Sequence, residues 1–345
     1  MRKNSTVGLI WVIIGTFIGA GFASGKEIAT YFSRFGFFSI ILAIMAGFLF
    51  CFFMKICLIV GKKVGATGGI YRTCFGRFGN VIKGIVIIAT FITVGSMLAG
   101  AFEIFGIFLS PFINILLLIF LMFLVGIIVI KNYAMITKVN SLLIPALLGA
   151  IFITCIVFLT DKNYDLVIDK ISLFQGFSSL FSYVSFNMLS TGIFLIEVGA
   201  KYDEKQIKTA SFFSSSIITL FIILAGVSLF LGGDRVMDSS LPLVSLARGL
   251  NGFLNISMIV VVFIGLTTSL ISDVYVLGLY AGNICKNKIL TIFLILLIGF
   301  LISLMGFSFI VVNLYALLGG LGILFLFAIV FCYMKFRVKS NKKTS

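Results

Sequence analysis

The chain has 345 residues, of which 61% are hydrophobic and only 11% are charged, and its mean hydropathy is +1.25. Soluble domains are about half apolar and about a quarter charged, so this composition excludes a soluble domain. The net charge of +15 lies in short segments, none long enough to form a folded basic domain that would bind nucleic acid. A membrane enzyme is not expected, because the chain lacks histidine and paired carboxylates within its apolar segments.

Apolar runs of about 20 residues recur along the whole chain, as transmembrane helices require. They do not alternate in polarity with period two, as strands of a membrane barrel would. No cleavable signal peptide is evident, since no small-residue cleavage site and soluble chain follow the first run. The sequence therefore predicts an all-α polytopic protein of the cell membrane with ten spans. The predicted spans are 6–31, 36–60, 82–109, 112–130, 139–160, 175–199, 209–231, 253–280, 289–306 and 308–334.

The basic residues indicate how these spans are oriented. With the N-terminus in the cytoplasm, 20 of the 26 lysines and arginines fall on the cytoplasmic side. Most acidic loop residues, including Asp165, fall on the outer side. This is the bias of the positive-inside rule. We therefore expect both termini in the cytoplasm, and the basic surface there to attract anionic lipid.

The first span carries four glycines between Gly15 and Gly25, followed directly by Lys26 and Glu27. Opened backbone is tolerated at membrane depth only inside the protein or beside an aqueous cavity, and many transporters hold ions and anionic solutes there. Close helix packing through small residues is the alternative. We predict a break, with a solute carboxylate meeting exposed amides. The candidate solute contacts are Gly19, Ala20, Gly21, Phe22, Ala23, Ser24 and Gly25.

Ten spans divide into two halves of five, 6–160 and 175–334, which an odd number of spans forces to be inverted in the membrane. The counterpart of the first span is then the sixth, and its middle is crowded with hydroxyl groups and an amide before Gly192. Paired interruptions in inverted halves mark transporter binding sites, although such side chains also bond back to their own helix. We predict a second break, with Ser185, Asn187 and Ser190 as solute contacts.

The eighth span contains adjacent hydroxyl residues in the stretch 265–269, Gly-Leu-Thr-Thr-Ser. Hydroxyl and carbonyl oxygens suit Na⁺ because it is a hard cation. An opened backbone between Gly15 and Ile18 could supply the carbonyls from the opposite side.

A few charged residues remain near the spans, where such groups are usually functional. Lys26 and Glu103 are candidates for an outer gate, with a structural ion pair as the alternative. Asp273 lies toward the cytoplasm, where it could contact Arg2 or Lys3 as an inner latch or simply face a solvated vestibule.

The stretch 19–27, Gly-Ala-Gly-Phe-Ala-Ser-Gly-Lys-Glu, together with the ten-span plan, resembles the YkvI-like membrane proteins. These are grouped as permeases of the amino acid–polyamine–organocation superfamily. More distantly, the layout is similar to the bacterial leucine transporter and its sodium-coupled relatives. That resemblance implies a fold in which the first and sixth helices unwind around the solute.

The resemblance also implies a sodium site, because Gly265 to Ser269 is similar to the Gly-Leu-Thr-Ser-Ser run of that family. Carried over, its ligands are the carbonyls of Gly15, Ile18 and Ile264 and the hydroxyls of Thr267 and Thr268. Proton-coupled members place a lysine in the fifth helix, and this chain has none in its interior, which favours Na⁺. The second sodium site of the leucine transporter needs an asparagine that is absent here.

These observations predict a secondary transporter that moves a small solute, such as an amino acid, together with Na⁺ by alternating access. A proton-coupled or ion-independent permease, a sensor that kept the fold, and a channel remain alternatives. A channel would repeat a pore loop or a charged ring across subunits, whereas two unlike broken spans suit alternating access.

Overall fold

The computed structural model describes residues 5–64, 70–131, 134–161, 172–281 and 287–341. In these ranges every regular element is a helix, so the all-α prediction is confirmed. The helices are α1 (Thr6–Phe17), α2 (Ala20–Ser24), α3 (Lys26–Tyr31), η1 (Ser33–Phe35), α4 (Phe38–Val64), α5 (Ile70–Phe75), η2 (Gly76–Phe78), α6 (Gly79–Gly106), α7 (Pro111–Lys131), α8 (Ala134–Asp161), α9 (Leu173–Gly199), α10 (Glu204–Leu231), α11 (Asp234–Met237), α12 (Pro242–Arg248), α13 (Gly252–Ala281), α14 (Lys288–Ser303), α15 (Phe307–Phe309), η3 (Ile310–Leu314) and α16 (Tyr315–Asn341).

Each of the ten predicted spans coincides with helix in the structure. Most boundaries agree closely, but the helix of the tenth span continues to Asn341 rather than ending at 334. Among the described residues, seven helices are long and apolar enough to cross a membrane by themselves. Three further apolar segments are shorter: α1 (Thr6–Phe17), the part Ile144–Thr160 of α8, and α14 (Lys288–Ser303). The first of these is short because its span is divided between α1, α2 and α3.

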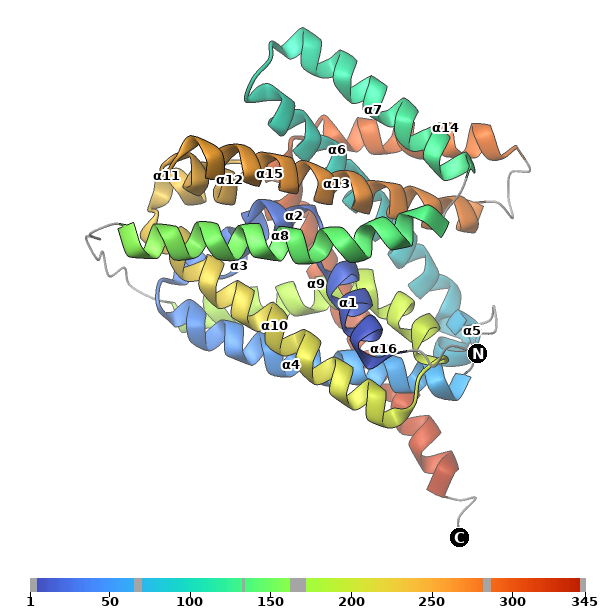
Figure 1. The fold of residues 1–345 in the computed structure, drawn as a ribbon. Coiled ribbons are helices and arrows are strands. Elements are labelled where there is room, and N and C mark those ends of the chain that lie inside the picture. The colour runs from blue at the N-terminus through green and yellow to red at the C-terminus, as the bar shows by residue number, and fades with distance from the viewer. Residues whose placement is uncertain (1–4, 65–69, 132–133, 162–171, 282–286, 342–345) are drawn as a thin grey trace.

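The long helices form two packed groups (Figure 1). In one group α4 packs against both α9 and α10, and α1 packs against α10, while α16 lies along α9. In the other group α6 packs against α13 and α14, and α7 contacts all three. The helix α8 contacts α1 and α10 of the first group and α13 of the second. The two short segments α2 and α3 lie where the groups meet, since α2 contacts α6 and α13 of the second group and α3 contacts α9 and α10 of the first.

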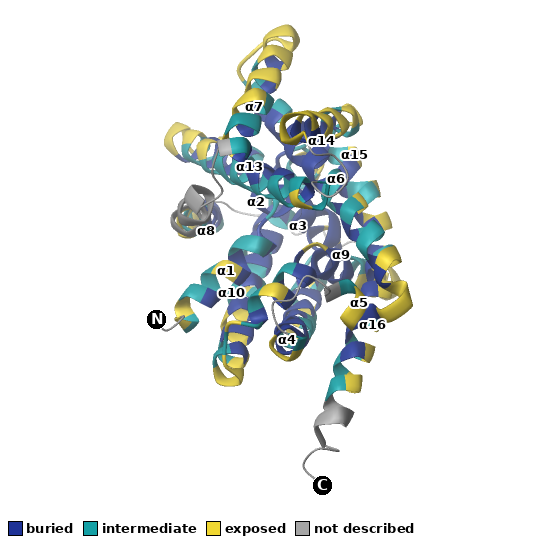
Figure 2. Cartoon of the chain, turned by 90° about the vertical axis from the view of Figure 1, so that its right-hand side faces the viewer, coloured by how far each residue is buried: buried dark blue, intermediate teal, exposed yellow. Residues whose placement is uncertain are grey.

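The outward faces of these helices are apolar and the interior carries the core (Figure 2). Large hydrophobic side chains stand exposed on α7, α14 and α16, for example Phe112, Phe293 and Phe327. Soluble proteins seldom expose contiguous apolar surface of this kind, whereas a hydrocarbon layer covers it without penalty. The arrangement is that of an integral membrane protein whose apolar outer surface faces the lipid hydrocarbon.

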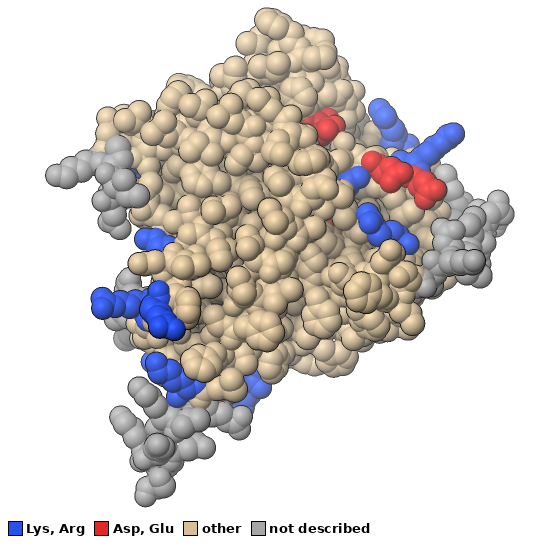
Figure 3. Space-filling view, turned by 180° about the vertical axis from the view of Figure 1, so that it is seen from behind, with Lys and Arg blue, Asp and Glu red and all other residues tan. Residues whose placement is uncertain are grey.

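The two described ends of the chain lie at the same end of the molecule (Figure 1). Seen from behind, Lys and Arg side chains gather at that end with no acidic side chain among them, whereas both signs of charge meet at the opposite end (Figure 3). The opposite end carries α11 and α12. This asymmetry matches the pattern that the loop charges predict.

The predicted interruption of the sixth span is wrong, because α9 is one continuous helix from Leu173 to Gly199. Its hydroxyl and amide groups bond back to their own helix. Asn187 donates to the Tyr183 carbonyl at 3.0 Å, and Thr191 donates to the Asn187 carbonyl at 2.8 Å. Such i to i−4 bonds satisfy the side chains without opening the backbone, so a polar cluster alone does not break a membrane helix.

Candidate functional site

The first span is broken at Ile18 and Gly19, as predicted. The helix α1 ends at Phe17, the next two residues are extended with ψ of 97° and −169°, and α2 starts at Ala20. A helix end leaves its last carbonyl groups without intrahelical donors, and the start of the next helix leaves free amides. Ile18 is only 6% exposed. The break therefore places unsatisfied backbone groups inside the protein, where only a solute, an ion or a neighbouring helix can reach them.

A second bend follows at Gly25, which separates α2 from α3. Its φ of +82° lies in the left-handed region that favours glycine. A Cβ atom at this position would also lie 2.6 Å from Leu243 Cγ on α12. Glycine is thus required twice, by the backbone conformation and by the close approach of α12. Directly after this bend, the Lys26 side chain runs to the turn after α11, whereas the Glu27 side chain folds back over Gly21.

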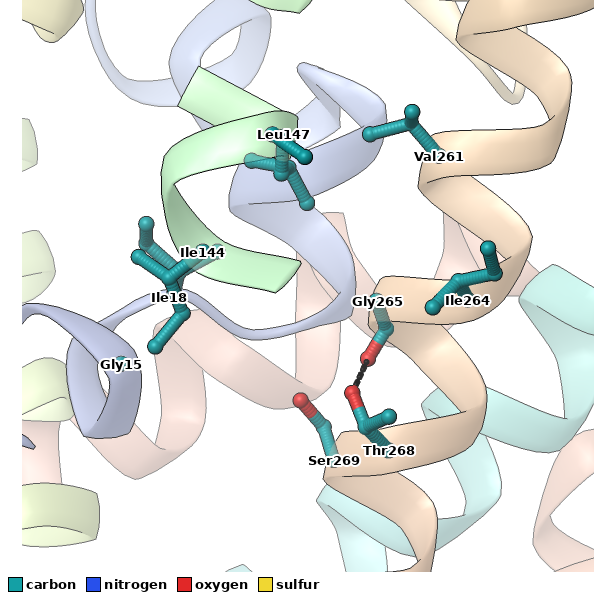
Figure 4. A pocket seen from close by; sticks show the side chains of 10 residues that line it. Gly15, Ile18, Ile144, Leu147, Val261, Ile264, Gly265, Thr268 and Ser269 are labelled. Atoms are coloured by element: carbon teal, nitrogen blue, oxygen red, sulfur yellow. Dashed lines mark hydrogen bonds between the residues drawn. The ribbon is translucent and has the colours of Figure 1, made fainter. Parts of the chain in front are cut away.

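A cavity of about 100 Å³ lies beside the break, between α1, α8 and α13. Figure 4 shows Gly15 and Ile18 on one side and the α13 residues Thr268 and Ser269 on the other, with the Ser269 hydroxyl pointing into the space between them. The lining residues are Gly15, Ile18, Ile144, Ala146, Leu147, Val261, Ile264, Gly265, Thr268 and Ser269. This volume suits an ion with a few water molecules.

Four of the five predicted sodium ligands line this cavity: Gly15, Ile18, Ile264 and Thr268. Thr267 is not among the lining residues, and its hydroxyl donates to the Phe263 carbonyl at 2.8 Å. Ser269 takes its place at the cavity. Ser269 belongs to the Gly-Leu-Thr-Thr-Ser run, but neighbouring positions on a helix diverge by about 100°. Which of these hydroxyls face α1 therefore depends on how α13 is rotated about its axis.

The predicted solute contacts divide into two sets. Residues 20–25 are buried around the break, and Gly19 is half-buried. On α9, however, the Ser185 hydroxyl donates to the Gly319 carbonyl of α16 at 2.6 Å, and Ser190 is exposed. These two serines therefore lie away from the break. Asn187 is buried but its amide is engaged by the Tyr183 carbonyl.

The sequence reasoning missed two α9 side chains that meet the broken span: Ser179, whose hydroxyl donates to the Tyr31 carbonyl at 2.9 Å, and Tyr183. The Tyr183 ring lies 5.4 Å from that of Tyr31, 4.9 Å from that of Phe32 and 6.3 Å from that of Phe17, measured between centroids. Tyr183 is fully buried. Tyr183 lies on the same face of α9 as Asn187, because the two residues are four positions apart. Grouping the polar residues of the sixth span by helical face could therefore have suggested Tyr183.

The gate candidates make contacts other than the predicted ones. The Lys26 ammonium donates to the carbonyls of Met237, Asp238 and Ser239 at 3.3, 3.1 and 2.9 Å. The predicted pair with Glu103 is therefore wrong, because the turn between α11 and α12 offers three acceptors at once. Glu103 instead lines a separate cavity with Arg248.

The third gate candidate, Asp273 on α13, accepts a hydrogen bond from the Thr93 hydroxyl on α6 at 2.7 Å. It thereby ties together two helices of the same packed group. Its predicted partners, Arg2 and Lys3, lie outside the described residues, so the inner latch stays a prediction.

Known proteins show where this architecture recurs. No protein-family model matches the chain. The chain is 24% identical over 340 residues to the uncharacterized membrane protein YkvI of Bacillus subtilis (strain 168), covering 95% of this chain and 96% of the relative. It is also 25% identical over 327 residues to the uncharacterized protein YyaD of the same organism, covering 92% and 94%.

Among solved structures, the fold is similar to the inward-facing conformation of Mhp1, with a TM-score of 0.67, 14% identity, and coverage of 91% of this chain and 72% of that one. The chain therefore has the leucine-transporter-like fold.

Proposed function

We propose that the protein is a secondary transporter that moves a small solute across the cell membrane by alternating access, with Na⁺ as the coupling ion. The observation that carries this proposal is the break at Ile18 and Gly19, which leaves unsatisfied backbone groups buried beside a cavity. A structural membrane helix gains nothing from such a break, whereas a transporter uses it to bind its cargo. The fold shared with Mhp1 supports the proposal.

The arrangement of the helices supports alternating access. The cavity is bounded by α1 of one packed group and α13 of the other, with α8 contacting both. Relative rocking of the two groups would open and close this boundary. Two inverted halves, 6–160 and 175–334, would explain why helix contacts occur in pairs. If each helix is replaced by its counterpart in the other half, the α4–α9 contact becomes the α10–α1 contact. In the same way, the α6–α14 contact becomes the α13–α7 contact, and all four contacts are present.

The oxygen donors around the cavity fit Na⁺. The end of α1 offers the carbonyls of Gly15 and Ile18, and α13 offers the hydroxyls of Thr268 and Ser269 together with the Ile264 carbonyl. All are neutral oxygens, which a monovalent hard cation accepts without a buried counter-charge. An ion bound between α1 and α13 would favour the state in which these helices are close, and its effect on the equilibrium equals its difference in affinity between the two states.

The solute would bind beside the break, and an amino acid or a related compound fits the exposed backbone groups there. Both termini would lie in the cytoplasm, because the basic end of the molecule carries both of them.

Uptake into proteoliposomes tests this proposal. Radiolabelled amino acids and related compounds are offered with an inward Na⁺ gradient, with an inward proton gradient in the absence of Na⁺, and with neither. Saturable uptake driven by Na⁺ alone supports the proposal. Uptake driven by the proton gradient without Na⁺ would refute the coupling ion but retain the transporter, and unsaturable flux would indicate a channel instead.

A further inference from the structure

Buried polar atoms without partners gather beside the broken span. Among the described residues, seven buried side-chain oxygens have no hydrogen-bond partner, and five of these lie on α3, α6 and α9. Buried polar groups in native proteins are nearly always paired, so each exception calls for a ligand or another explanation. The five residues are Glu27, Tyr31, Ser96, Ser182 and Tyr183.

The position of Glu27 follows from two glycines. The bend at Gly25 turns the start of α3, and the Glu27 side chain then folds back over Gly21, where a Cβ atom would lie 2.6 Å from the carboxyl carbon. Glu27 is only 3% exposed. The neighbouring Lys26 does not neutralise it, because that ammonium donates to three carbonyls near α11. The carboxylate is therefore held in the interior without a cation from its own segment.

Three buried tyrosines belong to the elements that pack around the helix of this carboxylate. Tyr31 lies one helical turn after Glu27 on α3, and its ring is 5.4 Å from that of Tyr183 on α9. The third, Tyr315, follows the turn η3, which contacts α3. Tyr315 follows directly after the π-helical turn Ile310–Leu314, and its ring stacks on Phe186 with centroids 4.2 Å apart. Such turns often mark functional positions in helices, and this one helps to place the third tyrosine.

We propose that Glu27 and the tyrosines 31, 183 and 315 bind an ammonium group of the transported solute. This inference rests on the proposed transport function and names the chemical class of its cargo as an amine, whether an amino acid or an amine without a carboxylate. An unpaired buried charge is costly, so buried carboxylates are usually paired with a cation. Tyrosine hydroxyls accept further ammonium hydrogens, and aromatic faces attract organic cations within about 6 Å. Na⁺ has no comparable need for aromatic rings, and the cavity proposed for it beside α13 is lined by other residues.

Binding to the purified full-length protein tests this without requiring transport. Each proteinogenic amino acid is compared with its deamino acid and its decarboxylated amine, by the rise in unfolding temperature in detergent and then by calorimetric titration. Compounds that carry the ammonium group should bind, and their deamino analogues should not. In Glu27→Gln, which keeps the shape but removes the charge, affinity should fall about tenfold to 100-fold, because a hydrogen bond to a charged group is lost.

Two further variants sharpen the assignment. Glu204→Gln removes an equivalent charge from the exposed start of α10 and should leave the affinity unchanged. Tyr183→Phe removes only one hydroxyl and should weaken amine binding by a few fold. Size-exclusion chromatography checks that each variant is folded.

The proposal is overturned if the compounds that bind include deamino acids, if no amine binds, or if Glu27→Gln binds the amine as tightly as the wild type. An unchanged affinity combined with lost proton uptake would assign Glu27 to proton coupling instead. Amine binding without uptake into proteoliposomes would support this inference while refuting the transport function. Uptake of a solute that lacks an amine would support the transport function while refuting this inference.

Discussion

Replacing Gly25 by alanine should destabilise the protein by about 2–5 kcal/mol. A residue with a Cβ atom in the left-handed region loses about 1–2 kcal/mol, and φ at Gly25 is +82°. The new methyl group would also lie 2.6 Å from Leu243 Cγ and 3.2 Å from the Leu243 backbone nitrogen. Overpacking of a core typically adds about 1–3 kcal/mol, and a backbone atom cannot move aside as a side-chain tip can.

Gly76→Ala is the matched control, because Gly76 also has a positive φ, of +55°, but has nothing within 4 Å of its Cβ position. It should lose only the backbone contribution of about 1–2 kcal/mol. The assay is thermal unfolding in detergent, followed by reaction of the buried thiols of Cys57 and Cys155 with a fluorogenic maleimide. Equal unfolding temperatures for Gly25→Ala and Gly76→Ala would show that the contact with α12 does not limit this position.

Three further predictions follow from the same geometry. Thr268→Val should raise the external Na⁺ concentration needed for half-maximal uptake several-fold, whereas Thr267→Val should change it little because Thr267 does not line the cavity; equal effects would contradict the assignment. Lys26→Met removes three hydrogen bonds to the turn after α11. A cysteine introduced at the buried Val244 of α12 should then react at least about tenfold faster with an impermeant reagent added outside. An unchanged reaction rate would show that Lys26 does not hold this end of the protein closed. A cysteine introduced at Asp165 should be labelled from outside the cell, and labelling only from inside would invert the topology.

The sequence predicted the helices and the break in the first span because their causes are local. Apolar runs of fixed length give the spans, and the glycines around Gly19 weaken a helix wherever they occur. The same local reasoning failed for the sixth span. The hydroxyl and amide groups from Ser185 to Thr191 can either line a break or bond back to their own helix, and the composition is identical in both cases.

The contacts between distant segments could not be predicted from one sequence. The position of the Lys26 ammonium depends on where the turn after α11 packs, and that turn is more than 200 residues away. The fold-back of Glu27 over Gly21 depends on the conformation of Gly25 and on α12. Likewise, the exchange of Thr267 for Ser269 at the cavity depends on the rotation of α13, which packing against α6 and α8 decides.

Counterflow is the measurement that tests alternating access most directly. Proteoliposomes are preloaded with an unlabelled amine or amino acid that binds the purified protein, diluted into trace labelled solute with equal Na⁺ on both sides, and sampled over time. A carrier that returns loaded should accumulate the labelled solute transiently above its external concentration, and Gly21→Val, which displaces Glu27 at the break, should abolish this overshoot. Labelled solute that only rises to its external concentration in the wild type would contradict the account, because a channel equilibrates without exchange.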